Sequence, residues 1–326
     1  MNADEFRCAP KDDAIHGEAR PGYFEWWYFD ALFDDGNSSY STSWHINGLG
    51  ANGRIRFHHY DAEGNKSHIE ADFLPDQALS SKETCDVRMG DNWLQGEFPE
   101  WRMRFRHQDF GYDLTLRNLT QGVRRPPDGD AVFSKDPPLS NGWVIGQPRA
   151  DVSGHLIVKG REIQVHGTGY HDHNWGMAGV STAGLSGMGA IYDFWYWGRL
   201  YLPNHTIVYS VGRAAERLGG WPVNLMLVLK GDTLVASSGR LDFEERNMTV
   251  DELTGCPYPR ELVLKFGHRA VEGQVSLKLI RVFQQTQNSG PGRAYLSFLA
   301  DCDADIQVAG ESVRAKVRAI HELMRP

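Results

Sequence analysis

The chain has 326 residues, of which 41% are hydrophobic and 23% charged. These proportions are typical of globular proteins and exclude a disordered or collagen-like chain. The net charge of -8 and the pI near 5.9 indicate no basic surface for nucleic acid or anionic lipid. The longest aliphatic run, 225–229, is far shorter than the roughly 20 residues of a membrane-spanning helix, so we expect no integral membrane segment.

The first residues, 1–13, carry charges and lack the apolar stretch of a secretory signal, which predicts a cytoplasmic protein. A secreted protein whose leader has been removed is the alternative, because several asparagines begin N-x-[ST] acceptor sequences; these are Asn37, Asn65, Asn118, Asn204 and Asn247. The cysteines lie far apart and form no CxxC pair, so we predict free thiols; they are Cys8, Cys85, Cys256 and Cys302.

Hydrophobic and polar residues alternate with a period of two in several windows. In 101–106, Trp, Met and Phe take one parity and three arginines take the other, as a half-buried antiparallel strand requires. The same pattern recurs in 112–117, 262–266 and 275–279, and no window of comparable length favours a helix. The sequence predicts an all-β fold of antiparallel β-barrels or sandwiches.

Two motifs recur along the chain. Segment 25–29, Glu-Trp-Trp-Tyr-Phe, matches 193–197, Asp-Phe-Trp-Tyr-Trp, and a pattern that leads to His171-Asp172 matches one that leads to His321-Glu322. This repeat predicts an internal duplication into two domains, 1–178 and 187–326. We expect the junction in the glycine- and serine-rich run 176–189, and extra length of the first half in the proline-rich stretch 126–148.

The densest cluster of reactive side chains is 169–176, Gly-Tyr-His-Asp-His-Asn-Trp-Gly. His171 and His173 would point the same way on a strand and could bind a metal, although the spacing supplies no third ligand. They could instead form buried structural hydrogen bonds with an aspartate. In the interpretation that we favour, Asp172 is a general acid whose pKa is raised by burial among aromatic rings.

The segment 26–29 is aromatic on both parities and is flanked by Glu25 and Asp30. Any single ring is more often part of a core than of a site. A strand with two apolar faces nevertheless suits a position between two packed layers, and pockets often occur between domains. We therefore expect an aromatic pocket at the seam of the two domains, where ring faces could stabilise a carbocation.

Segments 23–30 and 169–176 resemble the two signature segments of the carotenoid 1,2-hydratase family, also called hydroxyneurosporene synthases. The resemblance extends, more thinly, over most of the chain. It implies two tandem lipocalin-like β-barrel domains and a hydrophobic, unsaturated isoprenoid or polyene substrate. The family also includes prenyl-chain hydratases and Diels–Alderase-type cyclases.

The resemblance implies that Asp172 protonates an alkene, with Tyr170 beside it. We add His173 and Glu25 to the catalytic candidates, because Glu25 or Asp193 could orient the water or hold the acid protonated. The predicted pocket wall comprises Trp26, Trp27, Tyr28, Trp143, Trp175, Trp195 and Tyr196. This chemistry requires no cofactor and no metal.

Strict alternation from Ile163 and Val165 directs His171 and His173 into the barrel and sends Tyr170 and Asp172 to the opposite face. Either Gly167 and Gly169 host a bulge that shifts this register, or the outer face lines the seam, and we favour the seam.

Three functions remain open from the sequence. The first is a cofactor-independent hydratase (a lyase) or cyclase that acts by acid catalysis. The second is a pericyclase in which Asp172 or Tyr170 polarises a carbonyl, and the third is a non-catalytic lipid or pigment carrier. The expected partner is a hydrophobic small molecule, and the sequence does not fix the oligomeric state.

Overall fold

The computed structural model describes residues 6–18, 20–47, 53–125, 129–179, 187–288 and 290–326. Within these ranges the chain is built almost entirely of β-strands, so the predicted all-β fold is confirmed. The helical elements are short 3-10 helices, namely η2 (Pro10–Asp13), η3 (Pro75–Gln77), η4 (Gly187–Ala190) and η5 (Glu216–Leu218). No helix in this part of the chain is long and apolar enough to cross a membrane.

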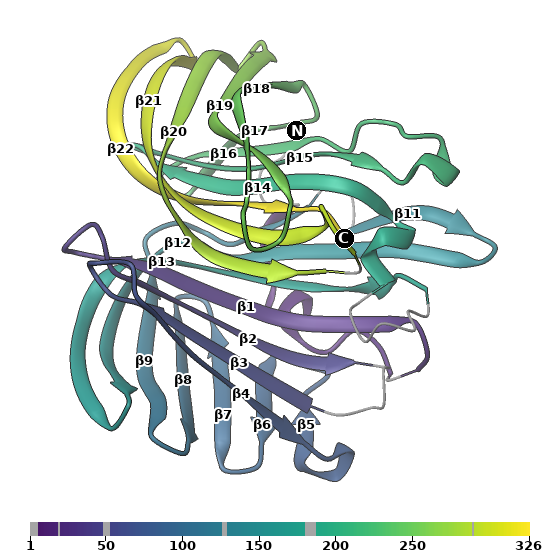
Figure 1. The fold of residues 1–326 in the computed structure, drawn as a ribbon, viewed down its shortest axis with the longest axis vertical. Helices are drawn as coiled ribbons and strands as arrows, with labels where there is room; N and C mark the ends of the chain where they lie inside the picture. The colour runs from purple at the N-terminus through teal and green to yellow at the C-terminus, as the bar shows by residue number, and fades with distance from the viewer. Residues whose placement is uncertain (1–5, 19, 48–52, 126–128, 180–186, 289) are drawn as a thin grey trace. The chain divides into compact units, whose positions relative to one another are not determined.

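The chain divides into two compact units, Met1–Ser186 and Gly187–Pro326. Each unit contains one curled antiparallel sheet, and the two sheets form a near-barrel and a half-barrel (Figure 1). The predicted junction 176–189 lies partly outside the described residues, because 180–186 are not among them. Its first two residues, Gly176 and Met177, end the last strand of the first unit.

The first unit has a 13-stranded sheet in the order β4-β3-β2-β1-β13-β12-β9-β8-β7-β6-β5, with β10 and β11 paired to β12. Its strands are β1 (Tyr23–Phe33), β2 (Ser39–Asn47), β3 (Gly53–Tyr60), β4 (Lys66–Phe73), β5 (Ala78–Ser80), β6 (Cys85–Met89), β7 (Asn92–Glu97), β8 (Glu100–His107), β9 (Phe110–Asn118), β10 (Val123–Arg124), β11 (Asp130–Lys135), β12 (Pro138–Val158) and β13 (Arg161–Met177).

The second unit has a 9-stranded sheet in the order β17-β16-β15-β14-β22-β21-β20-β19-β18. Its strands are β14 (Tyr192–Tyr201), β15 (His205–Ala214), β16 (Leu225–Lys230), β17 (Thr233–Ser238), β18 (Leu241–Val250), β19 (Pro257–His268), β20 (Val271–Gln287), β21 (Ala294–Val308) and β22 (Glu311–Met324).

The two sheets share one topology, in which the first strand of the unit pairs with its last strand: β1 with β13, and β14 with β22. The duplication predicted from the motifs is therefore also a duplication of strand order. The first unit adds β10, which ends just before the proline-rich stretch, and β11, which lies within it, and also β5 and β6 at one end of the sheet. Its extra length thus lies in two places, of which the sequence indicated one.

The motif match differs from the structural match by one residue. In sequence Phe29 aligns with Trp197, but in the sheets Phe29 lies opposite His171 and Gly198 lies opposite His321. Both strands carry aromatic residues on both faces, so residue type alone does not fix which face a side chain takes. A register shift between Tyr192 and Phe194 accompanies the difference.

Bulky side chains fill the interior of the first sheet. Trp27, Trp44, Phe57, Phe105 and Tyr112 are all fully buried there, and burial of each such ring stabilises the fold by about 1.5–3 kcal/mol. The interior is therefore a packed hydrophobic core.

The segment that precedes β1 is fixed to the rim of this sheet. The backbone N–H of Cys8 donates to the carbonyl of Gly122 at 3.0 Å, and that of Ile15 donates to the carbonyl of Ser81 at 3.0 Å. Helix η2, which lies between them, ends at Asp13, a buried residue. Residues 8–15 are thus part of the folded unit.

Candidate active site

The pairing of β1 with β13 is continuous from Tyr23 opposite Met177 to Phe33 opposite Gly167, without a bulge. An added Cβ at Gly167 or Gly169 would lie 2.4 Å from the carbonyl oxygen of Leu32 or 2.6 Å from that of Asp30. These glycines therefore allow close approach of β1 and do not shift the register. The bulge alternative is wrong for this pairing.

Strict alternation consequently decides the two faces of β13. His171 and His173 join the barrel side with Phe29 and Trp27, whose rings they stack against at 3.9 and 4.2 Å. Tyr170 and Asp172 lie on the outer face, where Asp172 is opposite Tyr28. The aromatic pocket between the two domains stays a prediction.

Three hydrogen-bond donors hold the carboxyl group of Asp172. Its Oδ2 accepts from Trp143 Nε1 at 2.8 Å and from Tyr170 Oη at 2.9 Å, and its Oδ1 accepts from Asn174 Nδ2 at 2.9 Å. Trp143 reaches the group from β12, whereas Tyr170 and Asn174 are the same-face neighbours on β13. The Asp172 side chain is only 5% exposed. The sequence had placed Trp143 only as a wall residue.

Burial raises the pKa of Asp172 from 3.8 to about 6. The hydrogen bonds from Trp143 and Tyr170 and the charge of His171 oppose this rise, while the charge of Asp30 adds to it. Glu25 and Asp193 were the predicted neighbouring carboxylates, and in the structure Asp30 is the carboxylate that acts on Asp172. An acid with a pKa near 6 is part-protonated close to neutral pH, which suits proton donation.

Asp30 lies in a compact arrangement of two tyrosines and two aspartates. Tyr28 Oη donates to Asp30 Oδ2 at 2.9 Å, just as Tyr170 donates to Asp172, and the two Tyr-x-Asp segments run antiparallel side by side. The spacing Tyr-x-Asp at 28–30 and 170–172 is visible in the sequence. Read as a repeated motif, it would have identified Asp30.

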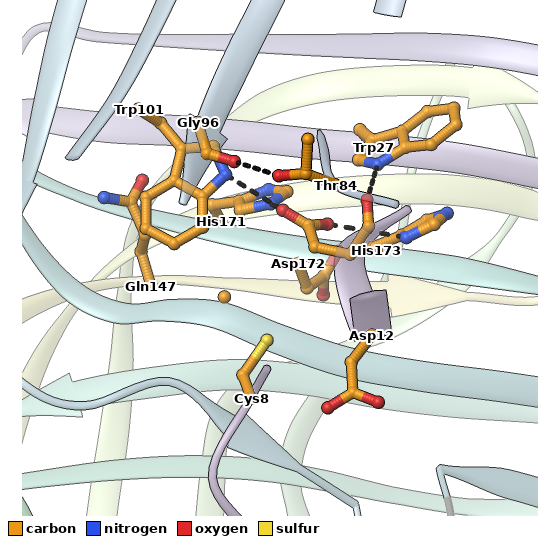
Figure 2. A network of polar contacts seen from close by, with 12 residues as sticks. Cys8, Asp12, Trp27, Thr84, Gly96, Trp101, Gln147, His171, Asp172 and His173 are labelled. Atoms are coloured by element: carbon orange, nitrogen blue, oxygen red, sulfur yellow. Dashed lines mark hydrogen bonds and ion pairs between the residues drawn. The ribbon is translucent and has the colours of Figure 1, made fainter. Parts of the chain in front are cut away.

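A second polar network lies on the barrel side of the same strands, as Figure 2 shows for Trp101, His171, His173 and Trp27. The Oδ2 atom of Asp13 accepts from Trp101 Nε1 and lies 2.9 Å from His171 Nε2. Asp13 Oδ1 is 3.4 Å from His173 Nδ1. Asp13 is 1% exposed, so this carboxylate is buried together with its partners.

Glu25 extends this barrel-side network. His173 Nε2 lies 3.0 Å from Glu25 Oε1, which also accepts from the backbone N–H of His16 at 2.7 Å. Glu25 Oε2 accepts from Tyr23 Oη at 2.5 Å. Two histidines therefore alternate with two carboxylates inside the barrel.

The charges of this network stabilise one another. Burial alone would raise the pKa of Asp13, but its hydrogen-bonded ion pair with His171 and its ion pair with His173 lower that pKa well below its usual value. Burial alone would lower the pKa of His173, and its ion pair with Asp13 and its hydrogen bond with Glu25 raise it instead. Buried charges persist in proteins when they are paired in this way.

The ring nitrogens of the two histidines point to carboxylates and to a backbone carbonyl. This agrees with the alternative in which the histidines form buried structural contacts with an aspartate. In the described part of the chain no group of three or more His, Cys, Asp or Glu side chains has the arrangement of a metal site. The four cysteines are free, as predicted.

The predicted site residues of the first unit thus separate into two sets. Asp172, Tyr170 and Trp143 are in contact on the outer face, with Tyr28 opposite Asp172 and Trp26 opposite Asn174. The barrel side holds Glu25, His173, Trp27, whose Nε1 donates to the carbonyl of Asp13 at 3.0 Å, and Trp175, which stacks on His16 at 3.5 Å.

Two predicted wall residues belong to the second unit. Tyr196 lies in its core and donates to Glu245 at 2.5 Å, whereas Trp195 packs edge-on against Tyr192 at 4.9 Å. The structural counterpart of Asp172 in this unit is Glu322, which lies opposite Trp197 on β14. Tyr295 donates a hydrogen bond to Glu322.

No family model matches the chain. In sequence it is 24% identical over 233 residues to a hydroxyneurosporene dehydrogenase of Chlorobaculum tepidum, a match that covers 61% of this chain and 59% of that protein. The predicted resemblance is confirmed. The matched region spans 59% of that relative, which is less than two thirds of its length.

Solved structures share the fold at low identity. Kievitone hydratase from Nectria haematococca superposes with a TM-score of 0.65 at 17% identity, covering 96% of this chain and 93% of that chain. CghA in complex with Sch210972 superposes with a TM-score of 0.65 at 13% identity, covering 99% of this chain and 97% of that chain. A protein of Nitrosomonas europaea provisionally assigned as AttH superposes with a TM-score of 0.69 at 16% identity, covering 97% of this chain and 95% of that chain. The two-unit β-architecture is therefore a known fold.

Proposed function

We propose that this chain is an enzyme that adds water to, or cyclises, a hydrophobic isoprenoid or polyene substrate, with Asp172 as the proton donor. The observation that carries the proposal is the buried carboxyl group of Asp172, held by three donors and with a pKa of about 6. The sequence resemblance to a hydroxyneurosporene dehydrogenase supports it. So does the fold shared with kievitone hydratase and CghA.

The hydrogen bonds indicate which oxygen carries the proton. Oδ2 accepts two hydrogen bonds, from Trp143 and Tyr170, whereas Oδ1 accepts one, from Asn174. Oδ1 therefore has the free lone pair and is the atom that transfers the proton. After transfer, all three donors stabilise the resulting carboxylate, so the acid is stronger than burial alone would make it.

The reaction then proceeds without a redox step. The Oδ1 proton forms a C–H bond to one alkene carbon as the π bond breaks, and the other carbon becomes a tertiary cation. A water molecule attacks this cation and returns one proton to Asp172, which restores the acid. For cyclisation, a second alkene of the substrate replaces the water as the nucleophile: its π electrons form the new C–C bond, and the cation left on its other carbon loses a proton from the adjacent carbon to Asp172, which gives a C=C bond and restores the acid.

Aromatic faces suit the cationic intermediate. Trp26 and Tyr28 lie on the same face as Asp172, and a desolvated ring face can stabilise a cation by up to ~2 kcal/mol. This chemistry belongs to the hydro-lyase or cyclase class and needs no cofactor. Trp27 and Trp175, on the barrel side, do not take part.

A pericyclase is the second candidate, favoured by the fold shared with CghA over 99% of this chain. In that reaction protonated Asp172 donates a hydrogen bond to a substrate carbonyl and keeps its proton. A carrier that holds its ligand inside the first barrel is less well supported, because bulky side chains fill that interior.

The test is to incubate the chain with neurosporene, squalene or kievitone in heavy-oxygen water and to follow oxygen incorporation by mass spectrometry. We expect Asp172→Asn to abolish incorporation, and the exposed-site variant Asp109→Asn to retain it. A pericyclic reaction on a linear polyene would survive in part in Asp172→Asn. An Asp172→Asn variant that hydrates at full rate contradicts the acid mechanism.

A further inference from the structure

A buried ion pair lies directly behind Asp172, on the barrel side of β13. We propose that Asp13 and His171 are positioning residues for the proton donor: they fix the strands at the point where Asp172 lies and place a positive charge next to it. This inference rests on the proposed function of Asp172 and names two residues that do not touch the substrate.

The position of the His171 ring is fixed by three contacts. Its Nδ1 lies 3.0 Å from the backbone carbonyl oxygen of Tyr28, its Nε2 lies 2.9 Å from Asp13 Oδ2, and the ring stacks on Phe29 with an interplanar angle of 3°. Tyr28 is the residue opposite Asp172 in the pairing of β1 and β13. The side chain of His171 therefore ties the two strands together at the site of the acid.

The hydrogen bonds also define the charge of the ring. Both nitrogens of His171 face acceptors, one a carbonyl oxygen and the other a carboxylate, and only the doubly protonated ring donates at both positions. A positive charge thus lies one residue from Asp172. It favours the carboxylate form and so counteracts part of the effect of burial on the pKa of Asp172.

Other groups face the ion pair from the surrounding elements. Trp101 of β8 donates to the same oxygen of Asp13, and His173 lies on the other oxygen. The thiols of Cys8 and Cys85 are close enough for the charge of Asp13, together with burial, to raise their pKa values. Asp13 therefore pairs with both histidines that flank Asp172 in the chain, and more closely with His171.

The groups that face Asp172 itself are those of the outer face. Trp143, Tyr170 and Asn174 donate to it, and Asp30 contributes a negative charge. Asp30 and His171 thus act on Asp172 in opposite directions, from opposite faces of the sheet.

The second unit supplies an internal comparison. His321, the counterpart of His171, is buried against Phe298 with a centroid distance of 4.9 Å, and its Nδ1 has no hydrogen-bond partner. Burial lowers the pKa of His321 to about 3, so this ring is neutral. The fold therefore accepts an uncharged histidine at this position, and the charge in the first unit follows from Asp13.

The experiment is an NMR titration of the Asp172 carboxyl group, with isotope-labelled aspartate, in the wild type, Asp13→Asn, His171→Gln and the double variant. We expect the pKa of Asp172 to rise in each single variant, because Asp13→Asn removes the carboxylate that keeps His171 charged and His171→Gln removes the ring itself. The double variant should rise no further, because either change alone already removes the positive charge. Tyr23→Phe is the matched control: it removes a hydrogen bond from the same network without changing any charge, and should leave the pKa of Asp172 in place.

The kinetic readout follows from the same shift. In Asp13→Asn the alkaline limb of the rate profile moves to higher pH, and the maximal rate falls because Asp172 is a weaker acid. A merely structural role for Asp13 would lower the rate without moving the limb.

Two results would overturn the inference. One is an unchanged pKa of Asp172 in Asp13→Asn; the other, measurable in the wild type even if the variants do not fold, is a His171 ring that carries a single proton. Failure of the proposed function is a separate outcome, because it shows as full activity of Asp172→Asn while the titration of Asp172 is still measurable in the wild type and the Asp13 and His171 variants.

Discussion

Asp172 and Glu322 occupy the same place in two sheets of the same topology, and an aromatic residue from the neighbouring strand donates to each of them. The histidine that precedes each carboxylate differs. His171 is paired with Asp13, whereas His321 is neutral because burial lowers its pKa to about 3. Both sheets thus contain a hydrogen-bonded carboxylate at this position. In the first unit Asp13, which lies outside the sheet in η2, adds the charged partner of the histidine.

The largest expected difference between the two units is in activity. Asp172→Asn should lower the hydration rate by about 10²–10⁴-fold, the usual contribution of a general acid. Glu322→Gln should leave the rate largely unchanged, because glutamine still accepts the hydrogen bond of Tyr295. Equal losses in the two variants, measured with the same alkene, would break the comparison and make Glu322 part of the catalytic machinery.

The next difference is in stability. Asp13→Ala leaves the charges of His171 and His173 without their shared carboxylate and should lower the free energy of unfolding by about 3–5 kcal/mol. His321→Leu replaces a neutral buried ring by an apolar side chain and should change it by less than about 1.5 kcal/mol. Urea denaturation followed by tryptophan fluorescence measures both. Similar losses would show that His321 has a polar role of its own.

A third prediction concerns the pH dependence of stability. The pKa of Asp172 is about 6 in the folded protein and near 3.8 in the unfolded chain, so the folded form binds more protons between these values. Stability due to Asp172 is therefore present below pH 4 and is lost as the pH rises through 6, by up to about 3 kcal/mol. Asp172→Asn should be more stable than the wild type at neutral pH, and this gain should vanish near pH 4.

Asp13 provides the control of opposite sign. Its pKa is lower in the folded protein than in the unfolded chain, so its contribution to stability is present above pH 4 and is lost as the pH falls. Denaturation curves of Asp13→Asn should therefore depend less on pH below 4 than those of the wild type. A gain in Asp172→Asn that is constant at all pH values would contradict the raised pKa of Asp172.

The smallest effect sharpens the comparison at the level of one hydrogen bond. Tyr170→Phe removes one of the two donors to Asp172 Oδ2, and this raises the pKa of Asp172 further. The alkaline limb of the rate profile should move to higher pH by about one unit or less. Tyr295→Phe, the matched change in the second unit, should leave that limb in place.

Much of the fold is predictable from the sequence because period-two alternation is a direct consequence of strand geometry. The same alternation correctly places Tyr170 and Asp172 on one face of β13 and His171 and His173 on the other. In one of the two alternatives drawn from the sequence, Gly167 and Gly169 host a bulge; in the structure they allow close approach of β1 without one.

The buried network was not predictable in the same way. Asp13 lies in a short charged segment, and nothing in the local sequence distinguishes it from its neighbour Asp12, which is only partly buried. Asp13 is brought to His171 only by tertiary structure. Glu25 was grouped with Asp172 because a second carboxylate could orient the water or hold the acid protonated, and His173 because it flanks Asp172 in sequence. Adjacent strand residues point to opposite faces, so His173 and its partner Glu25 lie on the barrel side. Trp143 was recognised as aromatic, and its role as a donor depends on where β12 lies.

The pairing of β1 with β13 has a consequence for how the first unit assembles during synthesis. β1 is made before β13, so its edge on that side finds its partner only after residue 177 has been made. Until then only the other edge of β1 can be paired, with β2. Late pairing of strands that are distant in sequence slows folding and prolongs the exposure of hydrophobic surface. The nascent chain should therefore need protection by chaperones for as long as the first unit is incomplete.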